Sequence, residues 1–257
     1  MSSISLACNF YREENAMPGL LENAAAFFDD FVMLHCPPAG VNPNDDPTLD
    51  ILRKWGIPWQ TGTLEHGFGA ARTQLIRETK TDWLWISDAD ERFYPMAPAL
   101  TCEGTEGYPQ FENPSLTVYG AGGVYDQGKL LREMMRTDQM AICVSRRHWF
   151  DFTWSRPCQN WDTIPDPQCR CVRAGEYLVY HGVMHEGLRD LRTGRTPDHN
   201  KLLTGPGGLF IDHYHCHFKA MEKEQRAQDI AVYDALHEDS TKEMWGKIQT
   251  ERDKINE

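Results

Sequence analysis

Three carboxylates follow an apolar run in the segment 83–92, which reads WLWISDADER. In an extended chain, side chains two residues apart point to the same side, so Asp88 and Asp90 form a pair. Such a pair can hold a hard divalent cation together with a diphosphate, because the cation neutralises the phosphate charge. A solvated acidic turn after a strand has the same pattern, and these letters alone leave both interpretations open.

Three histidines alternate with other residues in the segment 213–217, which reads HYHCH. In an extended chain, His213, His215 and His217 share one side, and neighbours stand about 6.5 Å apart. At that spacing, at most one or two of them can bind the same ion. The segment therefore indicates either a partial metal site or a group of core histidines held by hydrogen bonds.

The elements that must position these groups alternate between strand and helix before residue 95. Apolar runs predict strands at 4–8, 31–34, 57–59 and 83–86. Helical spacing predicts helices after Pro18, after Asp46-Pro47 and around 68–75, with Gly56 ending the second. Continuous apolar strands between helices are typical of a parallel sheet covered on both faces. Ligands bind such open sheets at the carboxyl ends of the strands, where we expect Asp88 and Asp90 to lie.

The later part of the chain is less regular. Residues 94–128 are rich in Pro, Gly and acidic side chains, and a weak boundary lies near residue 95. Beyond it we expect a helix at 129–140, strands at 141–144 and 177–180, and a polar helix at 220–237. This gives a first half at 1–95, a second half of the same domain at 96–220, and a helical tail at 221–257.

Composition and charge limit the class of protein. The 257 residues are 40% hydrophobic and 25% charged, which excludes a disordered or fibrous chain. A net charge of −12 argues against a protein that coats DNA. The most apolar early stretch, 24–34, contains two aspartates and is too short for a membrane span. We find no signal-peptide pattern, and the eight cysteines are irregularly spaced, so we expect a cytoplasmic protein without structural zinc.

Six segments, in their order and spacing, resemble family 2 glycosyltransferases of the GT-A fold, in the branch with DADE and HE motifs. They are 9–15 (NFYREEN), 46–52 (DPTLDIL), 67–73 (GFGAART), 81–91 (TDWLWISDADE), 167–173 (PQCRCVR) and 182–186 (GVMHE). The resemblance covers residues 4–95 well and 165–220 more loosely. It implies an α/β, Rossmann-like, mostly parallel sheet flanked by helices, with an acceptor-side extension and a C-terminal helix.

The same resemblance implies an activity. The protein would be a hexosyl- or pentosyltransferase that moves a sugar from a nucleotide-sugar, most often UDP-linked, to an acceptor hydroxyl with Mn²⁺ or Mg²⁺. Asp88 would face the ribose and the metal, and Asp90 would bind the metal and take part in catalysis. His213, with His215 in reserve, would be the later metal ligand. The nucleotide-binding residues would be Arg72, Asp88, Glu14 and His35.

The acceptor step needs a base that deprotonates a hydroxyl, and a carboxylate in a closed cleft can serve. Glu186 of the HE motif is the candidate, with Asp162 and Asp166 behind it. The alternative is a loop glutamate that binds acceptor hydroxyls or pairs with an arginine. The chain also departs from the family: His35 stands where an acidic residue usually reads the nucleobase, Thr73 follows Arg72 in place of Asn, and 96–140 match nothing in it.

The charge distribution bears on the acceptor. Residues 1–128 hold 7 basic and 18 acidic side chains, whereas residues 129–201 hold 12 basic and 9 acidic ones. Either the later arginines pair with local acids and the diphosphate, or the acceptor is anionic. An anionic acceptor would be an acidic glycan or, as with phage enzymes that modify hydroxymethylated pyrimidines, DNA. Otherwise it is a saccharide or protein hydroxyl.

Two other classes compete with a transferase. A metal-dependent hydrolase would use the histidines at 213–217, but it needs further His and Asp ligands on separate strands. A non-catalytic sugar- or nucleotide-binding module would keep the same fold. The aromatic run 149–154 and Trp161 either stack on a sugar or base or fill the core.

Overall fold

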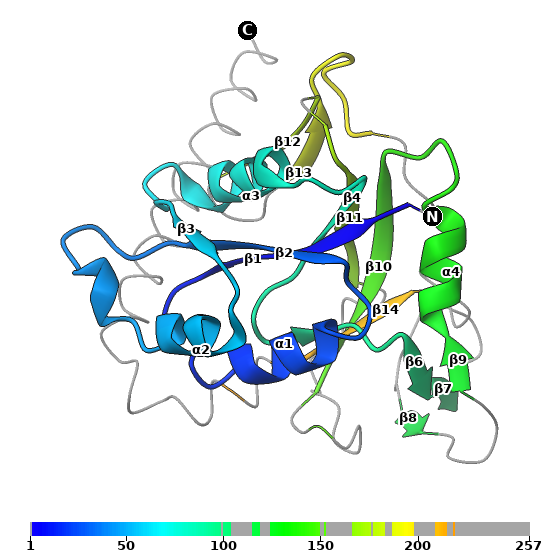
Figure 1. Cartoon of the computed structure of the whole chain (residues 1–257). Helices are drawn as coiled ribbons and strands as arrows, with labels where there is room; N and C mark the ends of the chain where they lie inside the picture. The colour runs from blue at the N-terminus through cyan, green and yellow to red at the C-terminus, as the bar shows by residue number, and fades with distance from the viewer. Residues whose placement is uncertain are drawn as a thin grey trace, which may run out of the picture.

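The computed structural model (Figure 1) describes residues 2–98, 100–103, 115–118, 124–149, 152, 166–175, 177–182, 187–197, 209–214 and 218. Within them, an eight-stranded sheet has the order β3-β2-β1-β4-β11-β10-β14-β5. Its strands are β1 (Ile4–Phe10), β2 (Asp30–His35), β3 (Trp59–Thr61), β4 (Trp83–Ile86), β5 (Glu91–Arg92), β10 (Ala141–His148), β11 (Asp166–Arg173) and β14 (Phe210–His213). β3, β2, β1 and β4 are mutually parallel, as are β10 and β14, whereas β11 and β5 run antiparallel to their neighbours. The predicted α/β fold with a mostly parallel, Rossmann-like sheet is confirmed.

Helices cover both faces of this sheet. They are α1 (Met17–Ala24), α2 (Thr48–Trp55), α3 (Gly67–Glu78) and α4 (Gln127–Met134). Figure 1 shows α1 and α2 on one face and α3 on the other. Successive strand residues point to opposite faces, so two cores form. Trp85 of β4 packs in the core of Leu20 and Leu131, and the adjacent Leu84 packs in the core of Leu75. This is why β4 is apolar at every position.

The first half of the chain follows the predicted elements closely. β4 occupies the predicted residues, and Gly56 ends α2 with a φ of 68°. β3 begins at Trp59, two residues later than predicted. The cause is the end of α2, where the Ile57 N–H donates to the Leu52 carbonyl and is therefore not available to a strand.

The second half departs further from the prediction. The helix expected at 129–140 is α4, which starts earlier because the Asp126 carboxylate accepts the Lys129 N–H as an N-cap. It also ends at Met134, earlier than the predicted residue 140. The strand expected at 141–144 continues as β10 to His148, because its last four residues pair with β14. The charged pair at 146–147 hid this continuation in the sequence.

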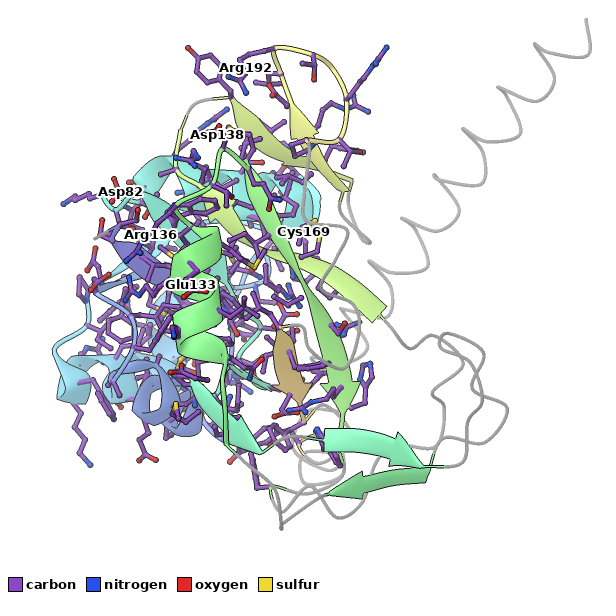
Figure 2. All side chains as sticks on the ribbon, turned by 90° about the vertical axis from the view of Figure 1, so that its right-hand side faces the viewer. Asp82, Glu133, Arg136, Asp138, Cys169 and Arg192 are labelled. Atoms are coloured by element: carbon purple, nitrogen blue, oxygen red, sulfur yellow. The ribbon has the colours of Figure 1, made fainter. Side chains whose placement is uncertain are left out.

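In the described part of the chain, three small two-stranded sheets lie outside the main one: β12 (Leu178–His181) with β13 (Gly187–Asp190), β6 (Met96–Pro98) with β9 (Val124–Asp126), and β7 (Leu100–Glu103) with β8 (Ser115–Val118). A 3₁₀ helix, η1, spans Pro43–Asp45. Figure 2 shows Arg192, in the turn after β13, at the end of the molecule opposite the other two small sheets.

The main sheet joins strands from both sides of residue 95, because β10, β11 and β14 extend the sheet that β1 to β4 begin. The division into a donor half at 1–95 and an acceptor half at 96–220 stays a prediction. The helical tail predicted at 221–257 lies outside the described residues. None of the helices in the described part combines the length and apolar character of a membrane span.

Candidate functional site

The DADE segment lies at the carboxyl end of β4, next to the end of β14. β4 ends at Ile86, and the chain turns through Asp88 and Asp90 into β5. β14 pairs antiparallel with β5, and this register places His213 opposite Glu91. The sheet therefore brings the carboxylates and the first histidine of the HYHCH segment to one edge.

Asp88 is held by two arginines. Its Oδ1 accepts from Arg72 Nη2 at 2.8 Å, and its Oδ2 accepts from Arg170 Nη2 at 2.7 Å. Burial disfavours the charged carboxylate, but Arg170 and Arg72 outweigh it and hold the pKa of Asp88 well below its usual range. Asp88 is therefore ionised, oriented and charge-compensated by the protein itself.

Glu91 shares this arginine cluster. Its buried carboxylate contacts Arg170, lies 3.8 Å from Arg146 Nη1 and accepts the Asp88 N–H at 3.1 Å. Burial raises the pKa of Glu91, and Arg170 opposes that shift. Sequence reasoning missed Arg170, whose segment was recognised only as a strand. β11 reads DPQCRCVR, so Arg170 is one of several polar residues in the strand and the pattern did not single it out.

Asp90 and His213 form the second contact of the site. His213 Nε2 lies 3.3 Å from Asp90 Oδ2, and both side chains keep some exposure, 11% for the histidine and 17% for the aspartate. Burial disfavours the charged imidazolium, yet Asp90 raises the pKa of His213 above its ordinary value. This pair joins the two groups that the sequence had assigned to a cation.

His148 is a third member of this group that the sequence analysis did not identify. It ends β10, pairs in register with His213, and its Nδ1 lies 2.8 Å from His213 Nδ1. The predicted strand at 141–144 stopped before it, so nothing in the pattern connected His148 to the site.

A second histidine–carboxylate pair lies at the end of β2. His35 is fully buried, and its Nε2 lies 3.0 Å from Asp46 Oδ2. Asp46 also accepts the Arg12 N–H at 2.8 Å and the Thr48 N–H at 2.8 Å. Burial opposes ionisation of Asp46, but the hydrogen bonds, led by that from His35, lower its pKa below the usual value. α2 has its N-cap at Pro47, one residue after the predicted cap, and without a side-chain cap hydrogen bond. The Asp46 carboxylate nevertheless accepts the Thr48 N–H at the start of this helix, and its contact with His35 is a second role that the pattern did not indicate.

Two of the predicted nucleotide-binding residues carry unsatisfied acceptors. His35 Nδ1 and Glu14 Oε2 are buried and have no hydrogen-bond partner among the described residues. Because the Asp46 carboxylate can only accept, the His35 proton lies on Nε2 and a neutral ring offers a lone pair at Nδ1. Buried acceptors without partners are costly, so such atoms favour a ligand with donors.

Other predicted site residues cannot be placed in this arrangement. Glu186 and His215 lie outside the described residues, and so does Asp162. Asp166 is the first residue of β11. Within the described residues, no group of three or more His, Cys, Asp or Glu side chains is arranged to hold a metal ion.

Comparisons with known proteins give partial matches only. No model of a protein family matches the chain, and no curated protein gives a significant match. The chain is similar to a solved structure of S. aureus TarS residues 1–349, with 19% identity and a TM-score of 0.29 over 36% of this chain and 28% of that one. It is also similar to another structure of S. aureus TarS, with 17% identity and a TM-score of 0.30 over 43% of this chain and 24% of that one. Similarity of this extent carries no conclusion about fold or activity.

Proposed function

We propose that this protein is a glycosyltransferase that moves a sugar from a nucleotide-sugar to an acceptor hydroxyl with the help of a divalent cation. The observation that carries the proposal is the meeting of Asp90, His213 and the arginine-held Asp88 at the carboxyl edge of the sheet. Open α/β sheets bind ligands at this edge. The resemblance of the DADE segment to family 2 glycosyltransferases supports the same chemistry.

Asp90 and His213 fit two adjacent ligands of Mn²⁺ or Mg²⁺. Ligands 2.1 Å from an octahedral ion and next to each other lie about 3.0 Å apart, close to the 3.3 Å between His213 Nε2 and Asp90 Oδ2. Diphosphate and water oxygens would complete the shell, since the described residues offer no third protein ligand in place. When bound, the cation would neutralise the diphosphate and stabilise the leaving nucleotide.

Asp88 has a different part in this proposal. Both its oxygens already accept from arginines, so direct metal binding would require it to give up a guanidinium. A carboxylate has about four lone-pair sites, and the remaining ones can accept from ribose hydroxyls. Arg72 and Arg170, which hold Asp88, would also supply positive charge toward the diphosphate in this proposal.

The nucleobase would be read by His35. In a neutral ring, the lone pair at its Nδ1 would accept a hydrogen bond from a donor on the base, and the N3–H of uracil is such a donor. A UDP-linked donor is compatible with this contact and stays our proposal. Glu14, with its unsatisfied Oε2, would accept a further donor from the nucleotide.

Glu186 remains the proposed base for the acceptor hydroxyl. Glu186→Gln keeps the shape and removes the base, so kcat should fall strongly while donor affinity stays nearly unchanged. A loss of donor binding instead would assign Glu186 to the nucleotide.

The arginines of the second half favour a neutral acceptor. Most described ones have partners within the protein: Arg147 with Asp212, Arg170 with Asp88 and Glu91, Arg132 with Asp29, Arg173 with the Thr137 and Gln139 carbonyls, and Arg192 with Asp190. We therefore propose a saccharide or protein hydroxyl as acceptor. Binding of duplex DNA that weakens steeply between low and moderate salt would instead support the DNA-modifying alternative.

The decisive experiment is turnover of a panel of nucleotide-sugars with Mn²⁺, with UDP-sugars expected to be the donors. UDP should also raise the melting temperature, which it would not do for a metal-dependent hydrolase. Nucleotide binding without turnover on any acceptor would indicate the non-catalytic module. Asp50→Asn, on the exposed face of α2, is the matched control for variants of Asp90.

A further inference from the structure

His148 and His213 are held side by side by the backbone. They are register partners on the parallel strands β10 and β14, and the Trp149 N–H continues the ladder by donating to the His213 carbonyl at 2.9 Å. Their rings meet edge to face, with centroids 4.8 Å apart and an angle of 69°. The two Nδ1 atoms are 2.8 Å apart, which is a hydrogen bond and therefore contains one proton.

The position of that proton decides what His213 Nε2 can do. A cation binds imidazole through a nitrogen lone pair, so a metal at Nε2 requires the His213 proton to lie on Nδ1. His213 Nδ1–H then donates, and His148 Nδ1 must accept. The proton of a neutral His148 consequently lies on its Nε2.

We propose that His148 is a positioning residue, which fixes the tautomer and the ring orientation of His213 so that Nε2 faces a divalent cation shared with Asp90. The proposal rests on the proposed metal-dependent function. Metal-bound histidines nearly always donate their second N–H to a protein acceptor, and that acceptor raises metal affinity. Here the structure gives His213 Nδ1 such a partner in His148, whose Nδ1 lies 2.8 Å away.

A histidine suits this position better than a carbonyl or a carboxylate, which can only accept. Without a cation, a neutral His213 whose Nε2–H donates to Asp90 has its lone pair at Nδ1, and His148 Nδ1–H then donates to it. His148 serves both states by exchanging its own tautomer. The pairing of the ends of β10 and β14 does not depend on the contact between the two histidines. Arg147 and Trp149 also donate buried hydrogen bonds of 2.7–2.8 Å to Asp212 of β14.

The first test measures Mn²⁺ affinity in the presence of UDP, by electron paramagnetic resonance of the free ion. His148→Leu removes the acceptor and should weaken binding about tenfold or more. His148→Gln keeps an acceptor oxygen and should stay within about threefold of the wild type. His66→Gln, at an exposed histidine, is the matched control. Unchanged affinity in His148→Leu overturns the inference while leaving the proposed function intact, whereas a wild type that does not bind Mn²⁺ overturns both.

The second test uses the unaltered protein. Histidine ¹⁵N NMR with UDP and diamagnetic Mg²⁺ should show a protonated Nδ1 on His213 and a protonated Nε2 on His148. Melting temperatures and circular dichroism of the variants check that the fold is kept. A His213 whose Nδ1 carries no proton in the Mg²⁺-loaded protein would contradict the proposal even if both variants failed to fold.

Discussion

Two histidine–carboxylate pairs lie at the carboxyl edge of the same sheet, and they are built differently. The His35–Asp46 pair at the end of β2 has no exposed side-chain surface, and two backbone N–H groups also donate hydrogen bonds to the Asp46 carboxylate. The His213–Asp90 pair at the end of β14 keeps some exposure, and its histidine is backed by another side chain, His148.

This difference separates a pair whose aspartate is held within the fold from a pair whose two members can exchange their mutual contact for a cation. Asp46 ties three segments together, since its partners come from the end of β2, the turn after β1 and the start of α2. Removing any partner would leave a buried charge with fewer hydrogen bonds. Asp90 and His213 have solvent access and each can exchange its contact to the other for a shared cation.

The largest effect should follow a change at the exposed pair. Asp90→Asn removes the charge that would bind the cation, so kcat/KM should fall about a thousandfold or more, equivalent to ~4 kcal/mol. The unfolding free energy should stay close to that of the wild type. Turnover of a UDP-sugar with Mn²⁺ measures the first quantity, with Asp50→Asn as control. Full activity in this variant, or in EDTA, would remove the cation from the mechanism.

The buried pair should dominate stability. His35→Ala leaves Asp46 buried with two backbone donors and should cost about 3 kcal/mol of unfolding free energy. His213→Ala, at the partly exposed pair, should cost about 1 kcal/mol but abolish Mn²⁺-supported UDP binding. Urea unfolding of both variants gives the comparison. The assignment of the two roles is wrong if His213→Ala proves the more destabilising change.

The two pairs also differ in how far the sequence predicted them. The run at 83–86 followed by Asp88 and Asp90 indicated a buried strand with carboxylates after its carboxyl end, and β4 occupies these residues. His148 could not be found, because its partner is determined by the pairing of β10 with β14, and Arg146 and Arg147 interrupt the apolar pattern of β10.

The other omissions have the same physical origin. Arg170 reads as an exposed charge until the fold places it, with a side-chain exposure of 2%, against Asp88 and Glu91. Asp46 was assigned to the start of a helix because that pattern involves neighbouring residues only. Its hydrogen bond to His35 depends on the path of the chain between β2 and α2. Local patterns predicted the elements and the carboxylates, but charge partners across the sheet required the topology.

The smallest effects, and the sharpest contrast, concern pH in metal-free protein. The folded-state pKa of Asp46 is lowered, so its contribution to stability is present above the unfolded pKa of about 3.9 and is lost as the pH falls through the folded value. The pKa of His213 is raised by Asp90 against the effect of burial. Its contribution is therefore present below about pH 6.5 and is lost as the pH rises through the folded value. The measurement is the free energy of unfolding in EDTA as a function of pH, for the wild type, Asp46→Asn and His213→Gln. Of the two variants, only Asp46→Asn should reduce the loss of stability at acid pH. Only His213→Gln should reduce the loss of stability toward alkaline pH. If both variants change the same limb of the pH profile, the two pairs do not differ in the way that their surroundings indicate.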